Sequence, residues 1–135
     1  MPRVLLAVLC DDVRQELGGK VSLMGIFTRF NVSDFTQPMP SFHVFVKIGF
    51  EALGDYPIDV ELRSSEGQRM FQLQGMAHVE AQEQTTNLYV ANLDLRMGNL
   101  RLPRPGSYEF ALRSNNQQID VVPFDAVVVA PPLVQ

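Results

Sequence analysis

The strongest constraint on the fold of this chain is a two-residue alternation of apolar and other side chains. It is clearest at Phe42–Glu51, where every second residue is a large apolar one. Successive side chains of a strand point to opposite faces of a sheet, so this period indicates a β-strand with one buried face. Tyr56–Arg63 and Ser107–Arg113 alternate in the same way. The chain is therefore expected to be built from strands.

Turn residues divide the sequence into about eight such strands, with no amphipathic helix of useful length. This pattern predicts an all-β chain in which residues 1–135 form a single antiparallel β-sandwich, immunoglobulin-like or C2-like. A closed barrel is the alternative, because strand number and alternation fit both. Pro123 favours open sheet edges, since proline cannot donate to a strand ladder. The expected strands are Val4–Leu9, Lys20–Val32, Phe42–Glu51, Tyr56–Arg63, Arg69–Val79, Thr85–Met97, Ser107–Arg113 and Ile119–Val129.

The first two strands are predicted to pair antiparallel. Asp11 and Asp12 are expected to end the first strand, and Gly18-Gly19 to supply the left-handed backbone of the reversal. Apolar residues change parity at Gly25, which favours a β-bulge. A backbone opening for a ligand at Gly25 is the competing interpretation.

Composition limits the classes of function. An apolar fraction of 46% excludes intrinsic disorder, and a net charge of −4 with scattered basic residues argues against a nucleic-acid partner. Arg96, Arg101 and Arg104 form the densest basic patch, which is typical of a solvated rim. No apolar run is long enough to cross a membrane, and Val4–Leu9 is shorter than the core of an export signal. With one cysteine and no intrachain disulfide possible, we expect a cytoplasmic protein.

Part of the N-terminal third is similar to a known family. The acidic pair after Cys10, then Gly19-Lys20, then Gly25-Ile26-Phe27, resembles an uncharacterised family of small bacterial proteins. The family places Phe-Pro before the next strand, whereas here two residues separate Phe35 from Pro38. The resemblance implies a β-sandwich of about this size and no known activity.

No constellation of residues points to catalysis. A nucleophile needs a base within hydrogen-bond reach, and only Cys10, His43 and His78 offer a thiol or an imidazole. Their spacing favours a structural cysteine and two unremarkable histidines, with His43 facing solvent. Gly18-Gly19-Lys20 precedes a strand, so it does not resemble a phosphate loop.

Metal binding is also not indicated. Asp11, Asp12, Asp55 and Asp94 are candidate calcium ligands at strand ends, but no loop has a dense run of oxygen ligands. We expect the acidic pair to bind turn backbone instead. The sequence thus predicts no catalytic, cofactor-binding or metal-ligating residue and no cofactor.

These observations favour a protein of unknown function that is not an enzyme: a binding or assembly domain with a protein partner or a second copy of itself. Its first or last strand is expected to be a free edge, and Phe27 and Phe45 are candidate exposed aromatics. A small-ligand binder for lipid, sugar or Ca²⁺ through loops at one end is the alternative, and a hydrolase ranks third. Tyr108 is expected to bury its ring and bond backbone through its hydroxyl.

Overall fold

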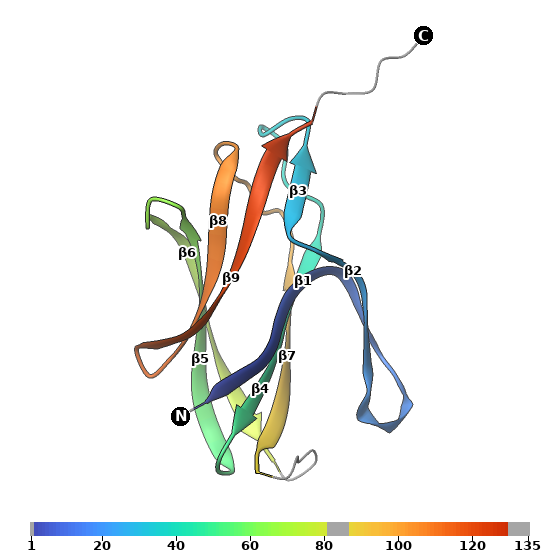
Figure 1. The fold of residues 1–135 in the computed structure, drawn as a ribbon, viewed down its shortest axis with the longest axis vertical. Coiled ribbons are helices and arrows are strands. Elements are labelled where there is room, and N and C mark those ends of the chain that lie inside the picture. Colours follow the sequence, from blue (N-terminus) through green and yellow to red (C-terminus); the bar gives the residue numbers. More distant parts are fainter. Residues whose placement is uncertain (1, 81–86, 130–135) are drawn as a thin grey trace.

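A computed structural model describes residues 2–80 and 87–129, which form an all-β structure of two sheets (Figure 1). One sheet has the strand order β2-β1-β4-β7 and the other has the order β3-β9-β8-β5-β6, so the described strands do not close into one barrel. The expected strand Thr85–Met97 begins with Thr85 and Thr86, which lie outside the described residues. The elements are β1 (Arg3–Gln15), η1 (Leu17–Gly19), β2 (Val21–Phe27), β3 (Arg29–Val32), β4 (Phe42–Phe50), β5 (Gly54–Ser64), β6 (Arg69–Val79), β7 (Tyr89–Met97), β8 (Gly106–Ser114) and β9 (Gln117–Val128).

The core lies between the two sheets, as the alternation predicts. In β4 the predicted dry face is buried along its whole length, and in β8 the same holds for Tyr108, Phe110 and Leu112. Phe45 is an exception, because it belongs to the outer face of β4 and is nevertheless fully buried. The prediction that Phe45 is exposed is wrong. Its neighbours across the sheet are Val8 and Asp94. Phe45 also lines a surface pocket together with the tip of the β1–β2 hairpin.

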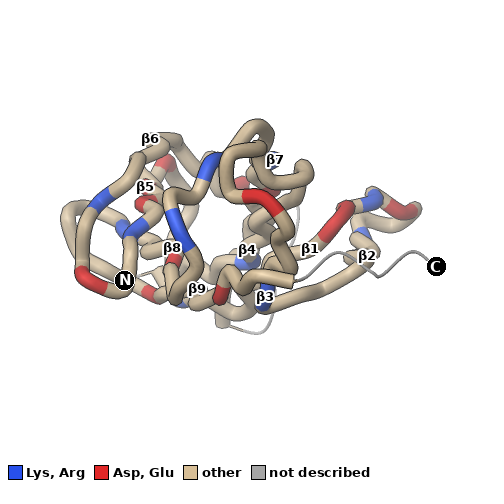
Figure 2. The backbone as a smooth tube through the Cα atoms, turned by 90° about the horizontal axis from the view of Figure 1, so that it is seen from above, with Lys and Arg blue, Asp and Glu red and all other residues tan. Residues whose placement is uncertain are grey.

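The β1–β2 hairpin is longer than expected. Asp11 and Asp12 do not end the first strand, because β1 continues to Gln15 and pairs antiparallel with β2 along its second half. Gly18 and Gly19 both have positive φ and form the turn, as predicted. The hairpin projects beside the two sheets (Figures 1 and 2). The pairing prediction is therefore confirmed, and the strand end is corrected.

The chain changes sheets at Thr28. Cys10 pairs with Ile26 and Asp12 with Met24, so the β1–β2 register is unbroken around Gly25 and the predicted bulge is wrong. The apolar parity changes because β2 belongs to one sheet and β3 to the other, and the two sheets face the shared core from opposite sides. The strand ends two residues beyond the glycine.

The second sheet is mixed, which corrects the purely antiparallel prediction. β3 pairs parallel to β9 from Arg29 to Val32, and β9 lies between β3 and β8. Pro123 is tolerated because β3 pairs only with Asp125 and later residues, so the side of β9 away from β8 has no described strand at Pro123. The last strand is therefore not an edge strand.

The predicted tyrosine contact is confirmed. The Tyr108 ring is buried against Phe124, and its hydroxyl donates to the Arg104 carbonyl oxygen at 2.6 Å. This bond ties the 98–105 connection to β8, next to Leu102, which is also buried.

We expect Tyr108→Phe to lower the free energy of unfolding by about 1 kcal/mol, because it removes one hydrogen bond and leaves the ring in place. Urea denaturation monitored by circular dichroism measures this difference. Tyr56→Phe is the matched control, since its hydroxyl also donates to a carbonyl, that of Ala52, but on an exposed turn. A Tyr108→Phe loss no larger than that of the control would contradict the buried role.

Candidate functional site

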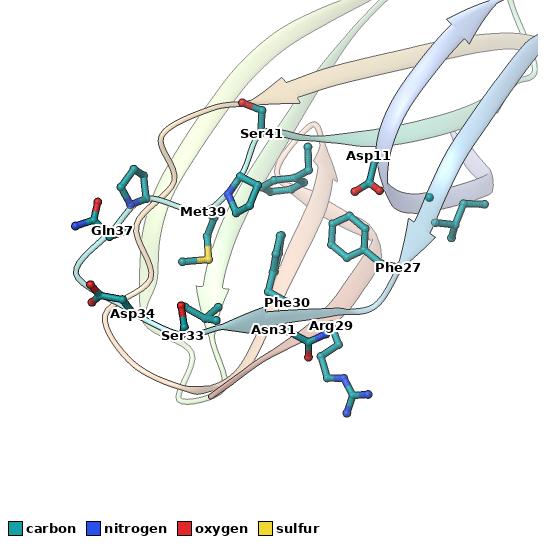
Figure 3. Close-up of a pocket in the computed structure, with 16 residues that line it drawn as sticks. Asp11, Phe27, Arg29, Phe30, Asn31, Ser33, Asp34, Gln37, Met39 and Ser41 are labelled. Atoms are coloured by element: carbon teal, nitrogen blue, oxygen red, sulfur yellow. The ribbon is translucent and has the colours of Figure 1, made fainter. Parts of the chain in front are cut away.

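A pocket of about 580 Å³ opens where the chain crosses between the sheets (Figure 3). We call it the crossover pocket. It is lined by Asp11 of β1, the end of β2, all of β3, and the connection from residue 33 to the start of β4. Its position follows from the fold, because the chain leaves one sheet at Thr28 and returns at Phe42. The connection is fixed where the Met39 N–H donates to the Leu100 carbonyl at 2.7 Å.

The base of the crossover pocket is aromatic. The Phe27 ring centroid lies 4.8 Å from that of Phe30 and 6.0 Å from that of Phe42, and Phe30 and Phe42 are 5.1 Å apart, all three pairs edge to face. Phe30 and Phe42 are buried and Phe27 is half-buried. The prediction that Phe27 is an exposed aromatic is therefore wrong, although one side of it borders the pocket.

The Asp11 carboxylate lies over Gly25 on the wall of the crossover pocket. Gly25 has φ +67°, and a Cβ there would overlap the carboxylate. Glycine thus permits both the left-handed backbone and the close approach of Asp11. No ion pair or hydrogen bond of the Asp11 carboxylate occurs among residues 2–80 and 87–129. Figure 3 shows Asp11 beside the Phe27 ring.

The other charged groups of the rim are engaged or turned away. Asp34 accepts hydrogen bonds from the Thr36 hydroxyl at 2.6 Å and from the Thr36 N–H at 2.9 Å. These bonds, the hydroxyl first, lower the pKa of Asp34 below its ordinary value. Arg29 extends away from the rings (Figure 3). The lining is therefore apolar at its base, with Asp11 as its inward carboxylate.

A second polar cluster occupies the outer face of β4, away from the crossover pocket. His43 Nδ1 lies 2.6 Å from Asp94 Oδ1, and His43 Nε2 lies 3.7 Å from Asp12 Oδ1. The prediction that His43 faces solvent is wrong, because only 15% of its side chain is exposed. Cys10 sits opposite His43 in the β1–β4 register and is fully buried.

This cluster does not resemble an activated thiol. Burial, helped by the charges of Asp94, Asp11 and Asp12, raises the pKa of Cys10 above its ordinary value. A raised pKa disfavours the thiolate, which is the nucleophilic form. The structure thus places the thiol near an imidazole, which the sequence did not suggest, and surrounds both with carboxylates.

The remaining candidates from the sequence stay apart. His78 bonds Asp55 on the surface, far along the chain from the Asp12–His43–Asp94 cluster. No group of three or more His, Cys, Asp or Glu in the described part of the chain is arranged to hold a metal ion. Asp12 accepts from the N–H of Val13, which lies within β1, so the bond to turn backbone that we expect for the acidic pair is not the one that forms.

The arginines of the predicted rim make ordinary surface contacts. Arg101 donates to the Thr36 carbonyl at 2.7 Å, and Arg104 pairs with Glu66 at 2.6 Å. These two side chains tie connections together at the surface.

Comparison with protein families gives one assignment. A model described as a family of unknown function, DUF6941, matches residues 5–127. The chain belongs to this family. The resemblance to an uncharacterised family is thereby confirmed, and DUF6941 carries no assigned activity. A comparison with curated protein sequences finds no match. Within the described ranges, no helix has the length and apolar character needed to span a bilayer.

Solved structures are similar to this DUF6941 chain in fold alone. A β-glucosidase from Listeria innocua in complex with glucose aligns at a TM-score of 0.51 and 11% identity, over 93% of this chain and 16% of that one. The alkylpurine DNA glycosylase AlkC of Pseudomonas fluorescens, bound to DNA containing an abasic site analog, aligns at 0.46 and 9% identity, over 93% of this chain and 30% of that one. This chain therefore spans less than a third of either protein.

Proposed function

We propose that this protein is a non-catalytic assembly domain that joins a second copy of itself through the edge of β2. The observation that carries the proposal is the chemistry of that edge. β2 is the outermost strand of its sheet, and among the described strands it pairs only with β1. Its sequence, VSLMGIF, has no charged residue and no proline.

Such an edge is unusual for a strand that stays unpaired. A free edge presents unpaired backbone N–H and C=O groups, and proteins protect it with charges, prolines or bulges. β7, the opposite edge of the same sheet, carries Asp94 and Arg96. On β2, by contrast, Ile26 is 59% exposed and no charge opposes pairing.

A second copy fits this edge because β2 is compatible with itself. Antiparallel pairing about a two-fold axis at Met24 places residue 24 opposite its own copy and Ile26 opposite Ser22. Like charges directly opposite each other destabilise a strand pair, and this register contains none. A two-fold interface must be complementary to itself, which a neutral strand satisfies.

The expected result is a dimer whose formation depends on protein concentration in sedimentation velocity. Met24→Lys should abolish it, because two ammonium groups would meet at the axis, and Met24→Glu should do the same. An equimolar mixture of the two variants should restore the dimer. Leu73→Lys, on the exposed face of the edge strand β6, is the control and should leave the dimer unchanged.

A wild-type protein that stays monomeric at millimolar concentration would overturn the proposal. So would a dimer that survives Met24→Lys, since its interface would lie elsewhere.

Ligand binding is a second candidate function, and the crossover pocket favours it. Small-molecule sites are concave and largely apolar, with a few placed polar groups. The connection from residue 33 to the start of β4 lines this pocket in part, so it is a specific location for the ligand. Lipid and sugar remain open ligand classes for it, whereas the described residues offer no metal cluster for Ca²⁺.

The same proposal includes the remaining expectations. We infer a cytoplasmic, bacterial, immunoglobulin-like or C2-like domain, supported by the two-layer arrangement and the Tyr108 contact, with β3 as a departure from that type. Acidic and basic positions alternate along the backbone without a long run of one sign (Figure 2), which supports the absence of nucleic-acid and membrane partners.

A further inference from the structure

We propose that the crossover pocket binds an organic cation: an ammonium or guanidinium group carried on a short apolar body. The Asp11 carboxylate pairs with the charge, and the rings of Phe27, Phe30 and Phe42 contact the apolar body. This inference rests on the second candidate function, ligand binding. The pocket shares Gly25, Ile26 and Phe27 with the β2 edge, so the two proposals are tested with separate variants.

The apolar part of the assignment comes from the rings. Their edge-to-face cluster forms the base of a cavity of about 580 Å³, a volume within the range of small-molecule pockets. Phe27 is only half-buried, so part of its ring surface remains available to a ligand. Aromatic faces also attract cations through the ring quadrupole, most strongly where water is excluded.

The sign of the charge comes from Asp11. Its carboxylate is held on the pocket wall over Gly25, beside the Phe27 ring, with no cationic partner among the residues that the structure describes (Figure 3). Arg29 points away from the rings, and Asp34 is the other acid of the rim. An anionic ligand would meet two carboxylates, whereas a cation gains an ion pair next to an apolar surface.

The residues around the pocket favour an organic cation over a metal ion. No cluster of carboxylates and imidazoles fit to hold a metal ion occurs in the described ranges. Asp12, the neighbour of Asp11, is directed to His43 on the outer face. A single carboxylate with three rings suits a cation that brings its own apolar surface.

Benzyltrimethylammonium is a suitable probe, with benzyl alcohol as its neutral counterpart and benzoate as its anionic one. We expect the ammonium compound to shift the amide resonances of Gly25, Phe27 and Phe30 in a saturable way, and the other two to bind far more weakly. Because Asp11 is exposed and the quaternary ammonium has no N–H to donate, Asp11→Asn should weaken binding of the cation by roughly fivefold. Asp34→Asn, the matched control on the same rim, should change it less than threefold, because its carboxylate is already bonded to Thr36. Phe27→Leu should weaken binding while keeping an apolar wall.

Two arms distinguish a free amine from a side chain of another protein. Acetyl-Gly-Arg-Gly-amide and acetyl-Gly-Lys-Gly-amide test a protein source, and benzyltrimethylammonium and butylammonium test a free one. Binding in either arm that is weakened by Asp11→Asn supports the inference and identifies the source. No binding of any cation, or equal binding of the alcohol, overturns it. Met24→Lys must leave cation binding intact, so failure at this pocket and failure at the β2 edge are separate results.

Discussion

Phe110→Ala is expected to lower the free energy of unfolding by about 3–5 kcal/mol, because it removes a fully buried aromatic side chain. Phe110 is fully buried in β8, and its ring stacks on Phe124 at 5.3 Å. It also contacts Phe42 of the facing sheet at 6.2 Å between centroids. Alanine would remove one of the rings that join the two layers, beside the Phe30–Phe42 pair, and leave a cavity that the rigid strands cannot close.

Urea denaturation of the wild type and the variant measures this difference in unfolding free energy. The m-value, which is the slope of that free energy against urea concentration, is fitted separately for each protein. Leu73→Ala on β6 is the control, because its side chain is 41% exposed, and it should cost about 1 kcal/mol or less. A Phe110→Ala loss as small as that of the control would mean that the aromatic cluster is not the centre of the core.

The sequence was sufficient to predict the parts of the fold that depend on local pattern. Alternation depends only on the geometry of neighbouring residues, so the buried face of β4 and the strand content were predictable. The Gly18-Gly19 turn and the Tyr108 contact were predictable for the same reason, since each follows from a short motif. These are the features in which nearby residues decide the outcome.

The errors occur where distant segments decide the outcome. The alternation around Gly25 showed that the chain changes its buried side, but it did not show that β3 joins a different sheet, in parallel with β9. Phe45 has the parity of an exposed residue, and its burial depends on β1, β7 and the hairpin tip. Pro123 indicated a free edge, which exists only beside the part of β9 that β3 does not reach.

The sequence singled out two residues of the crossover pocket but not their contact. Asp11 and Gly25 both belong to the motif shared with the uncharacterised family, and a ligand opening at Gly25 was the competing interpretation. Their meeting requires the β1–β2 register, which pairs residues on either side of them. Cys10 and His43 meet in the same way across β1 and β4. Pairing register is not readable from single residues, so neither cluster was predictable.

Gly25→Ala is expected to destabilise the protein by about 1–3 kcal/mol. The alanine would have to adopt a left-handed backbone conformation, and its Cβ would overlap the Asp11 carboxylate. Gly67→Ala is the matched control: Gly67 also has positive φ, but nothing lies within 4 Å of where its Cβ would be. Gly67→Ala therefore measures the backbone cost alone. The excess loss in Gly25→Ala measures the overlap with Asp11.

The double variant Asp11→Ala/Gly25→Ala separates these costs within the site itself. Asp11→Ala leaves the backbone strain at residue 25 and its own Cβ at 3.0 Å, but it removes the carboxylate, which is the closest neighbour of a Cβ there. Adding Gly25→Ala to Asp11→Ala should therefore cost less than adding it to wild type. A coupling free energy of at least about 0.5 kcal/mol in urea denaturation is expected. Strictly additive losses would show that Asp11 does not lie over Gly25 in solution, and the placement of the carboxylate on the pocket wall would then be wrong. The coupling thus tests, without any ligand, the geometry that makes Asp11 available to a cation.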